Sequence, residues 1–237
     1  KDSLCGRCSE KLWRVQHIWT KKEEENIREK KLMKELISDI SHQTKTPLAN
    51  MKLYLEFLKE ESLTEEGETF LCNLREQEDK LEFLLQSMVK MSRLENGIIQ
   101  IKCEPADLYG TLTAAIGGIV PAAEKKGIEL HVDCEEHVHL KHDRKWTEEA
   151  IFNVLDNAVK YTEPGGSIHI NVIRQEIFTK ISVRDTGRGI PSERYAEIFT
   201  RFYREPEVHE KSGVGIGLYL TRKILELQDG YVEVRSE

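Results

Sequence analysis

The stretch Asn153-Val-Leu-Asp-Asn157-Ala-Val-Lys160-Tyr-Thr162 decides how the second half of the chain is interpreted. It lies mostly in a predicted helix, and the spacing of four and then three residues puts Asn153, Asn157 and Lys160 on one face. Two amide oxygens and a lysine fit a magnesium–triphosphate complex, because Mg²⁺ takes a few oxygen ligands together with phosphate oxygens. Taken alone, the three residues are more simply explained as a polar helix face.

Two glycine clusters follow this helix. Asp185-Thr-Gly187-Arg-Gly189-Ile190 comes directly after an apolar strand, and Ser212-Gly213-Val-Gly215-Ile-Gly217 leads into an apolar helix. Glycines let backbone amides approach a phosphate, and a helix N-terminus adds partial positive charge. Turns also produce such clusters by chance. The chain has no G-x-x-x-x-G-K-[ST] loop, no G-x-G-x-x-G and no H-R-D or D-F-G set, which excludes the commonest other phosphate-binding motifs.

Strand and helix patterns alternate from Asn96-Gly97 onward. Strands are expected where residues alternate or are rich in β-branched types: Ile98–Lys102, Glu129–Asp133, Val138–Lys141, Ser167–Ile173, Phe178–Arg184 and Tyr231–Val234. Helices are expected at Asp107–Lys125, Asp143–Lys160 and Leu218–Leu227. Strands interspersed with helices predict an α/β sandwich with helices packed on one face of a sheet.

The first half has a helical period instead. From about Lys22 to Glu95, apolar residues recur at steps of three, four and seven, interrupted by the polar stretch 60–67. This pattern predicts an all-α antiparallel hairpin in which Pro47 kinks the first helix. A single hairpin cannot enclose its own apolar stripe, whereas two can form a four-helix bundle, so we expect a homodimer.

Composition limits the class of protein. The 237 residues correspond to one or two domains, with 39% hydrophobic and 32% charged residues. The net charge of −7 argues against a general nucleic-acid binder, which needs a basic face. No apolar run approaches the roughly 18 residues of a membrane helix. Because the chain starts at Lys1 without a signal peptide, we expect a soluble part of a longer protein.

Five cysteines, an odd number, are scattered through the chain, which fits a reducing compartment. Cys5 and Cys8 have the spacing of a zinc knuckle or a redox pair, and His17 lies not far beyond them. A closed zinc site needs four ligands, however, and no second pair follows at the expected spacing. Incidental linker thiols are the simpler explanation.

Together the motifs resemble those of sensor histidine kinases of two-component systems. The stretch 153–162 is similar to their N box, the two glycine clusters to their first and second glycine boxes, and Phe199-Thr-Arg-Phe202-Tyr-Arg204 to their F box. Ser41-His42-Gln-Thr-Lys-Thr-Pro-Leu48 resembles the H box. The resemblance implies a linker over 1–25 and a dimerisation and phosphotransfer hairpin over 26–96. Over 97–237 it implies an ATP-binding catalytic domain with a mixed sheet, of which the final strand is missing.

The resemblance also implies roles in binding ATP and Mg²⁺. Asn153 and Asn157 would hold the metal, and Lys160 would contact phosphate. Asp185 would bind the adenine amino group, with Gly187 and Gly189 close to the base and sugar. The glycines of the second box would bind the phosphates: Gly213, Gly215 and Gly217. The segment 205–211 would be a mobile lid anchored by the F-box phenylalanines. Arg204 would reach the phosphates or form a salt bridge, and Tyr161 would pack on the adenine or in the core.

In the first half, the resemblance implies that His42 accepts the γ-phosphoryl group of ATP. Many relatives carry Glu or Asp after this histidine, whereas Gln43 cannot take a proton. It can still hydrogen-bond the imidazole and fix its tautomer. Thr46 matches a position at which a polar side chain orients water for dephosphorylation of the partner protein. The resemblance therefore implies a kinase with phosphatase activity, or a protein in which phosphatase activity dominates.

The implied partner is the receiver domain of a response regulator, whose aspartate takes the phosphoryl group. The implied location is the cytoplasmic side of a bacterial inner or plasma membrane, reached only through upstream segments absent from this sequence. Two alternatives remain: a conformational ATPase of the same nucleotide-binding superfamily, and a scaffold with a degenerate nucleotide module. The first predicts a hydrolytic carboxylate near Asn153, and the second conflicts with the intact glycines.

Overall fold

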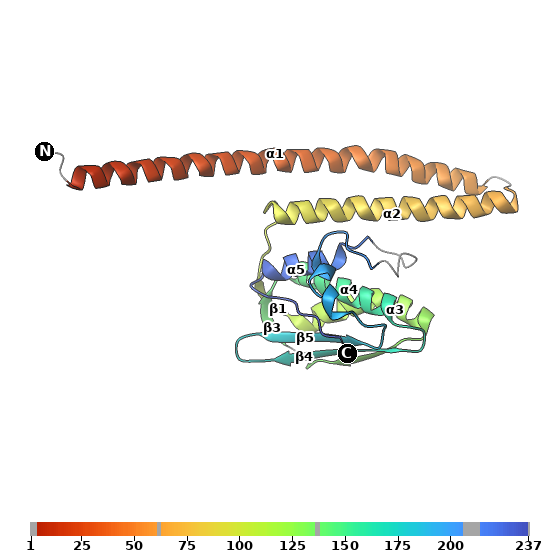
Figure 1. Ribbon diagram of the computed structural model, residues 1–237. Coiled ribbons are helices and arrows are strands. Elements are labelled where there is room, and N and C mark those ends of the chain that lie inside the picture. The colour runs from red at the N-terminus through yellow and green to blue at the C-terminus, as the bar shows by residue number, and fades with distance from the viewer. Residues whose placement is uncertain (1–3, 61–62, 136–137, 206–213, 237) are drawn as a thin grey trace. The chain divides into compact units, whose positions relative to one another are not determined.

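The computed structural model describes residues 4–60, 63–135, 138–205 and 214–236, without the side chains of residues 4–12, 15, 30 and 42. The chain divides into two compact units, Lys1–Ile99 and Gln100–Glu237 (Figure 1). The first unit is helical, and the second combines helices with two small sheets. The expected class, a helical hairpin followed by an α/β sandwich, is confirmed.

The first unit consists of helix α1, Leu4–Glu60, and helix α2, Glu65–Glu95. Ion pairs link Arg75 to Glu56 and Lys52 to Glu82. Of the two residues on α2, the later one in the sequence pairs with the earlier one on α1. The helices are therefore antiparallel. Helix α1 begins well before the predicted Lys22 and runs through most of the segment expected to be a linker.

A short connection joins the two helices. Thr64 caps α2, because its hydroxyl accepts a hydrogen bond from the amide of Gly67 at 3.1 Å. The first turn also carries three glutamates, which the positive end of the helix dipole favours. Among the residues that the structure describes, no helix is both long and apolar enough to cross a bilayer.

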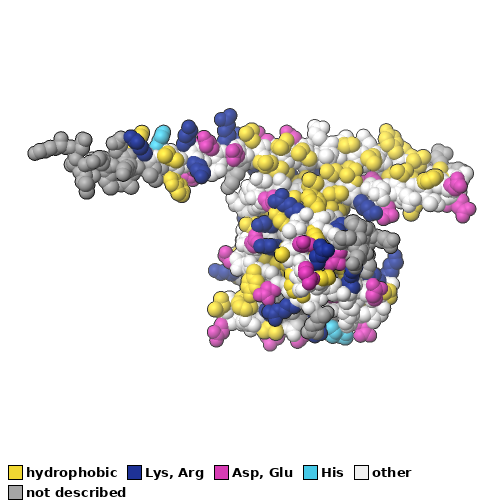
Figure 2. All heavy atoms as spheres, in the orientation of Figure 1, with side chains coloured by type: hydrophobic (Ala, Val, Ile, Leu, Met, Phe, Trp, Pro, Cys, Tyr) yellow, Lys and Arg dark blue, Asp and Glu magenta, His cyan; other side chains and the backbone are white. Residues whose placement is uncertain are grey.

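The hairpin covers only part of its apolar stripe. Leu48, Leu55 and Leu71 are buried, whereas other residues of the predicted stripe stay at least two-fifths exposed, namely Met51, Leu58, Leu74, Leu81 and Met88. Figure 2 shows hydrophobic side chains gathered along the hairpin. One hairpin therefore leaves much apolar surface in water, as the sequence predicts.

The second unit contains two sheets. In the smaller one, β1 (Glu104–Asp107) pairs antiparallel with β3 (His139–His142). The larger one is mixed: β4 (Ser167–Arg174) lies between β2 (Glu129–Asp133), to which it is parallel, and β5 (Thr179–Asp185), to which it is antiparallel. Helices α3 (Leu108–Lys126), α4 (Arg144–Tyr161) and α5 (Gly217–Glu226) lie on one side of this sheet (Figure 1). Short 3-10 helices span Ser192–Arg194 and Glu197–Phe199.

The core of this unit lies between α3, α4 and the mixed sheet. Helix α3 buries residues at steps of four, three, four and four, which form one face: Leu108, Leu112, Ala115, Ile119 and Ala123. Asp107 caps its start by accepting hydrogen bonds from two amides, and Gly127, at φ +63°, ends it. Leu155 of α4 and Ile168 of β4 are fully buried against this face.

The predicted strand Ile98–Lys102 is wrong. The amides of Ile98 and Ile99 both donate to the carbonyl of Arg93 and so complete the end of α2. The amide of Lys102 donates to a carboxylate oxygen of Asp143 at 2.9 Å. Since these donors are already used, ladder pairing begins only at Glu104. The alternation of side chains could not predict this outcome, because it carries no information on which acceptors the backbone amides bind.

The predicted strand Tyr231–Val234 is also absent. The segment is held at its far end, where the amide of Ser236 donates to the Tyr195 hydroxyl and its side chain accepts from the amide of Ile190. In the described part of the chain, β5 pairs only with β4 and forms an edge of the sheet. The other strands and helices predicted in this unit are confirmed with shifts of no more than one or two residues at their ends.

Candidate active site

Helix α4 carries the polar face formed by Asn153, Asn157 and Lys160. Asp143 caps the helix by accepting from the amide of Trp146 at 3.2 Å. The opposite face, which includes Ile151, Leu155 and Val159, is buried in the core. The three polar residues are consequently half-buried on the side turned away from the sheet, and the structure brings them together as the spacing predicts.

Asn153 lies against the start of helix α5. A Cβ atom at Gly217, the first residue of α5, would be 3.2 Å from Oδ1 of Asn153. Atom Nδ2 of Asn153 is buried and has no hydrogen-bond partner among the described residues. Thr221 holds the two helices together, because its buried hydroxyl donates to the carbonyl of Ala150 at 3.2 Å. A buried amide without a hydrogen-bond partner lowers the free energy of unfolding. Such unpaired polar groups are typical of sites that bind a ligand.

Lys160 forms an ion pair with Asp156 one turn earlier, with Nζ and Oδ2 2.6 Å apart. The pair is about one-third exposed or less at both side chains. A lysine held in this way can exchange its carboxylate partner for a phosphate when one arrives, because its stem is flexible and its charge is compact.

The first glycine cluster packs against the end of α4. Oδ1 of Asp185 accepts a hydrogen bond from the amide of Gly187 at 2.9 Å. A Cβ atom at Gly187 would lie 2.7 Å from this oxygen and 2.7 Å from the carbonyl oxygen of Tyr161. Only glycine fits there. Gly189 has φ +72°, a conformation that glycine adopts without strain.

Four charged groups lie around the phenol of Tyr161. Its half-burial raises the pKa of Tyr161; Arg204 and Arg188 oppose this shift, while Glu205 and Asp156 add to it. Arg188 also pairs with Glu205, at 3.5 Å. The end of α4, the first glycine cluster and the last F-box residue are therefore close together, as a shared binding site requires.

The start of helix α5 has features that favour an anion. Its N-cap residue, Ile216, makes no side-chain capping bond, and no acidic residue occupies its first turn. Gly215 has φ +75°, and a Cβ atom there would overlap the carbonyl of Tyr203. The first amides of a helix have no partner within the helix, and together with the helix dipole they favour a phosphate at this end. Gly213 and residues 206–211 of the expected lid lie outside the described residues.

The H-box residues lie in the middle of α1, within the helical unit. Gln43 and Thr46 are exposed, and the hydroxyl of Thr44 donates to the carbonyl of Ile40 at 2.7 Å. The side chain of His42 is outside the described set, as are those of Cys5 and Cys8. The part of the chain that is described holds no cluster of three or more His, Cys, Asp or Glu suited to a metal ion.

Two family descriptions match the chain, one on each unit. Residues 32–97 match the His Kinase A (phospho-acceptor) domain, and residues 142–237 match the histidine kinase-, DNA gyrase B- and HSP90-like ATPases. The chain belongs to the sensor histidine kinases of two-component systems. The H box lies within the first match, and the N, F and glycine boxes lie within the second.

Curated sensor histidine kinases resemble the chain along most of its length. The swarming motility regulation sensor protein RssA of Serratia marcescens is 30% identical over 202 residues, which are 85% of this chain and 42% of that protein. The alginate biosynthesis sensor protein KinB of Pseudomonas aeruginosa is 30% identical over 207 residues, 86% of this chain and 34% of that protein. The chain thus spans less than half of the length of each of these two relatives.

A solved structure resembles the chain over most of its length. The crystal structure of full-length ShkA in complex with AMPPNP matches 86% of this chain and 43% of that chain, with 26% identity and a TM-score of 0.71. This likeness extends over both units of the present chain.

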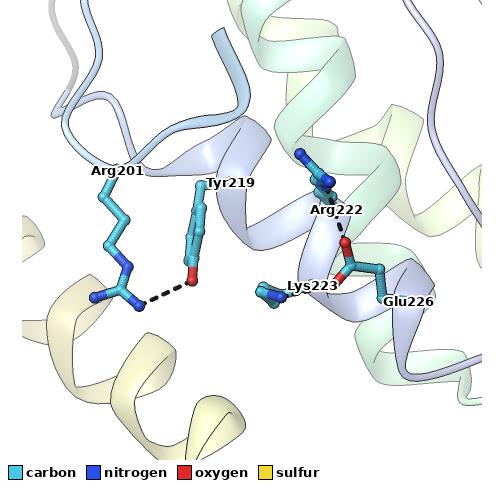
Figure 3. A network of polar contacts seen from close by, with 5 residues as sticks. All are labelled: Arg201, Tyr219, Arg222, Lys223 and Glu226. Carbon is cyan, nitrogen blue, oxygen red and sulfur yellow. Dashed lines mark hydrogen bonds and ion pairs between the residues drawn. The ribbon is translucent and has the colours of Figure 1, made fainter. Parts of the chain in front are cut away.

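Sequence reasoning missed several contacts that support the histidine kinase motifs. Lys126, at the end of α3, donates from Nζ to the carbonyls of Val159, Lys160 and Thr162 at 2.7–3.1 Å and so caps α4. Arg201, inside the F box, lies over the ring of Tyr219 in α5 (Figure 3). These pairs are 33 to 36 and 18 residues apart, so no local pattern indicates them.

Proposed function

We propose that the chain is the catalytic core of a sensor kinase: it binds Mg-ATP in the second unit and transfers the γ-phosphoryl group to His42. The phosphoryl group then passes to an aspartate in the receiver domain of a response regulator. The family and the five ordered motifs support this activity, and both family matches fall on the units that would carry its two halves.

The observation that best supports the proposal is the buried amide of Asn153 beside the start of α5. Three features form a cradle here: an amide group without a described partner, a helix N-terminus whose N-cap residue makes no side-chain capping bond, and glycines at which a Cβ atom would fill the space. A triphosphate with its metal fits this cradle, because phosphate oxygens can accept from Nδ2 of Asn153 and from backbone amides, while the amide oxygen of Asn153 suits Mg²⁺.

The side-chain oxygens of these residues are ligands of a type that Mg²⁺ accepts. Asn153 and Asn157 would hold it through amide oxygens, and when bound it would neutralise charge on the phosphates. Lys160 would leave Asp156 for a phosphate. Asp185, whose Oδ1 is already oriented by the amide of Gly187, would accept from the adenine amino group. The glycines of the second box, 213, 215 and 217, and Arg204 would surround the phosphates, and Tyr161 would pack near the base.

The transfer step needs a nitrogen nucleophile and a route for one proton. An imidazole nitrogen of His42 attacks the γ-phosphorus, an N–P bond forms, the bond to the bridging oxygen breaks and ADP leaves. The proton on the other ring nitrogen then has to depart. Gln43 cannot accept it, although its amide oxygen can hold the imidazole in the reactive tautomer. The proton would therefore go to solvent or to another base.

A second copy of the chain is the proposed partner of the hairpin. The helices leave large apolar residues exposed, among them Leu74, Leu81 and Met88. A second hairpin would bury these residues in a four-helix bundle. The response regulator would dock on the same hairpin, next to His42, and the whole protein would act as a sensor at a bacterial membrane.

Phosphatase activity toward the regulator is a second candidate function. Thr46 lies one helical turn after His42 and is exposed, so its hydroxyl is available to orient a water molecule. Since Gln43 weakens general-base assistance to phosphorylation but leaves this hydroxyl intact, the balance would shift toward dephosphorylation.

Incubation with γ-labelled Mg-ATP tests the proposal. The expected label is acid-labile, alkali-stable and absent from His42→Ala, which still binds ATP. Asn157→Ala is expected to lose Mg-ATP binding, and normal binding by that variant would remove the proposed metal site. If the wild-type chain binds ATP without labelling, Gln43→Glu should restore label in a base-impaired kinase. No binding by the wild type would instead favour the scaffold alternative.

A further inference from the structure

Two histidines lie side by side on the mixed sheet of the second unit. His131 in β2 and His169 in β4 are directly opposite each other in the parallel register. Their imidazole rings are stacked, with centroids 4.4 Å apart and planes inclined by 13°. Both residues are exposed, so the stack lies on the surface of the unit and is not part of its core.

The stack lies on the face of the sheet that is turned away from the helices. The residues that precede the two histidines, Leu130 and Ile168, pack in the core. Successive side chains in a strand point to opposite faces, so the imidazoles point outward. Helices α3, α4 and α5 lie on the other side of the sheet (Figure 1). Within the described part of this unit, no helix covers the two rings, and solutes can reach them.

The Nε2 atoms of both rings are at the same end of the stack. Nε2 of His131 is 3.4 Å from Oε2 of Glu129, and Nε2 of His169 is 3.4 Å from Oγ of Ser167. Glu129 and Ser167 are also opposite each other in the register. Each ring thus turns Nε2 toward the same row of the sheet, where a single ion can contact both nitrogens.

The separation of the rings suits a divalent transition metal. Imidazole nitrogen binds Zn²⁺ at about 2.0–2.1 Å, so two such nitrogens on one ion are at most about 4.2 Å apart. Rings with centroids 4.4 Å apart need only a small tilt to reach this separation. The carboxylate of Glu129 places negative charge beside the nitrogens, which favours a cation. Arg184, the residue of β5 opposite His169, is on the side of β4 away from β2 and so away from this point.

We propose that His131 and His169 form a surface site for a transition-metal ion of the type that imidazole binds, such as Zn²⁺ or Ni²⁺. The described residues offer no cluster of three or more His, Cys, Asp or Glu for a metal, so water completes the shell of the ion. Mg²⁺ is excluded, because it prefers oxygen ligands. The inference does not rest on the proposed function, since neither histidine belongs to the nucleotide-binding motifs.

Isothermal titration of the 237-residue chain with Zn²⁺ alone tests the site. His131→Ala and His169→Ala should each weaken the binding of one ion about tenfold or more, because a single imidazole cannot chelate. The double variant should bind little worse than either single variant, since each already lacks the chelate. In proton–nitrogen NMR spectra of the imidazoles, Zn²⁺ should shift the signals that these two substitutions remove.

Melting temperature gives a second readout of the same site. Zn²⁺ should raise the melting temperature of the wild type, because an ion that binds the folded chain stabilises it. It should not do so in the two single variants. Mg²⁺ at the same concentration should leave the NMR signals of both imidazoles in place.

His139→Ala is the matched control, because it removes an exposed histidine from the smaller sheet of the same unit. It should keep the wild-type Zn²⁺ affinity, and an equal loss in this variant would overturn the inference. Unchanged Zn²⁺ affinity in His131→Ala and His169→Ala would also overturn it and leave only a stacking contact between two strands. If the whole Zn²⁺ signal persists in these variants but disappears in Cys5→Ser, the ion binds the N-terminal cysteines and the inference fails.

Discussion

The side-chain amide of Asn153 in α4 lies directly against the place that a Cβ atom of residue 217 in α5 would occupy. A Cβ atom at Gly217 would lie 3.2 Å from Oδ1 and 3.5 Å from Cγ of that asparagine. Gly217→Ala should therefore displace the amide and raise the Kd for Mg-ATP about tenfold or more, which isothermal titration would measure. The unfolding free energy should change by less than about 1 kcal/mol, because the displacement is a few tenths of an ångström.

Gly117→Ala is the control for this substitution. Gly117 lies in α3, where an added Cβ would have no neighbour within 4 Å. The change should raise the unfolding free energy by about 0.5–1 kcal/mol, since alanine loses less backbone entropy in a helix. Nucleotide affinity should stay at the wild-type value. Equal losses of affinity in the two alanine variants would contradict the role given to Gly217.

Asn153→Leu should separate stability from binding. Leucine has nearly the shape of asparagine and removes the buried Nδ2 that has no partner among the described residues. We expect the unfolding free energy without nucleotide to stay the same or to rise by up to about 1–2 kcal/mol. The increase in melting temperature that Mg-ATP gives the wild type should disappear. Thr162→Val is the stability control, because it removes a different buried polar group without a described partner, the hydroxyl of Thr162.

A loss of several kcal/mol in Asn153→Leu would mean that the amide stabilises the fold. It would then have a structural partner, and its assignment to the metal would fail. Denaturant titration monitored by circular dichroism separates the two outcomes, because the expected change and the contradicting one have opposite signs.

Local chemistry made the helices and most strands predictable from sequence. Asp143 precedes α4 with a side chain suited to an N-cap, and Gly127 follows α3 in the left-handed conformation. Strand β2 was predicted with its observed bounds, Glu129–Asp133. The N box and first glycine box were predicted to form one site only through their resemblance to the motifs of histidine kinases, because residue type and spacing alone were explained as well by a polar helix face and a turn aspartate.

Contacts between distant residues were not predictable. The amides of Ile98 and Ile99 are used to end α2, so the alternation of their side chains was misleading. Helix α1 extends to Leu4 through a charged stretch with no clear apolar period. Lys126 is one of many surface-type lysines in the sequence, and only the fold brings it to three carbonyls. These features depend on tertiary geometry, which a linear pattern does not contain.

Lys126→Met should destabilise the second unit. The substitution keeps most of the aliphatic stem but removes three charge-assisted hydrogen bonds at the C-terminus of α4. The unfolding free energy should fall by about 1.5–3 kcal/mol. Lys125→Met, at the exposed neighbouring position, should change it by less than about 0.5 kcal/mol. Matching denaturation midpoints for the two variants would show that the cap contributes nothing.

Tyr161 should make stability depend on alkaline pH. Burial raises the pKa of Tyr161 above the ordinary value of 10.0 despite the opposing charges of Arg204 and Arg188. The folded chain therefore holds this proton more tightly than the unfolded chain does. The resulting stabilisation is fully present below the ordinary pKa and is lost as pH rises through the folded-state value. Tyr161→Phe has no proton to lose at this position. In denaturant titrations between about pH 8 and 11, the wild type should lose unfolding free energy faster than this variant; parallel curves would mean that the phenol ionises equally easily in both states.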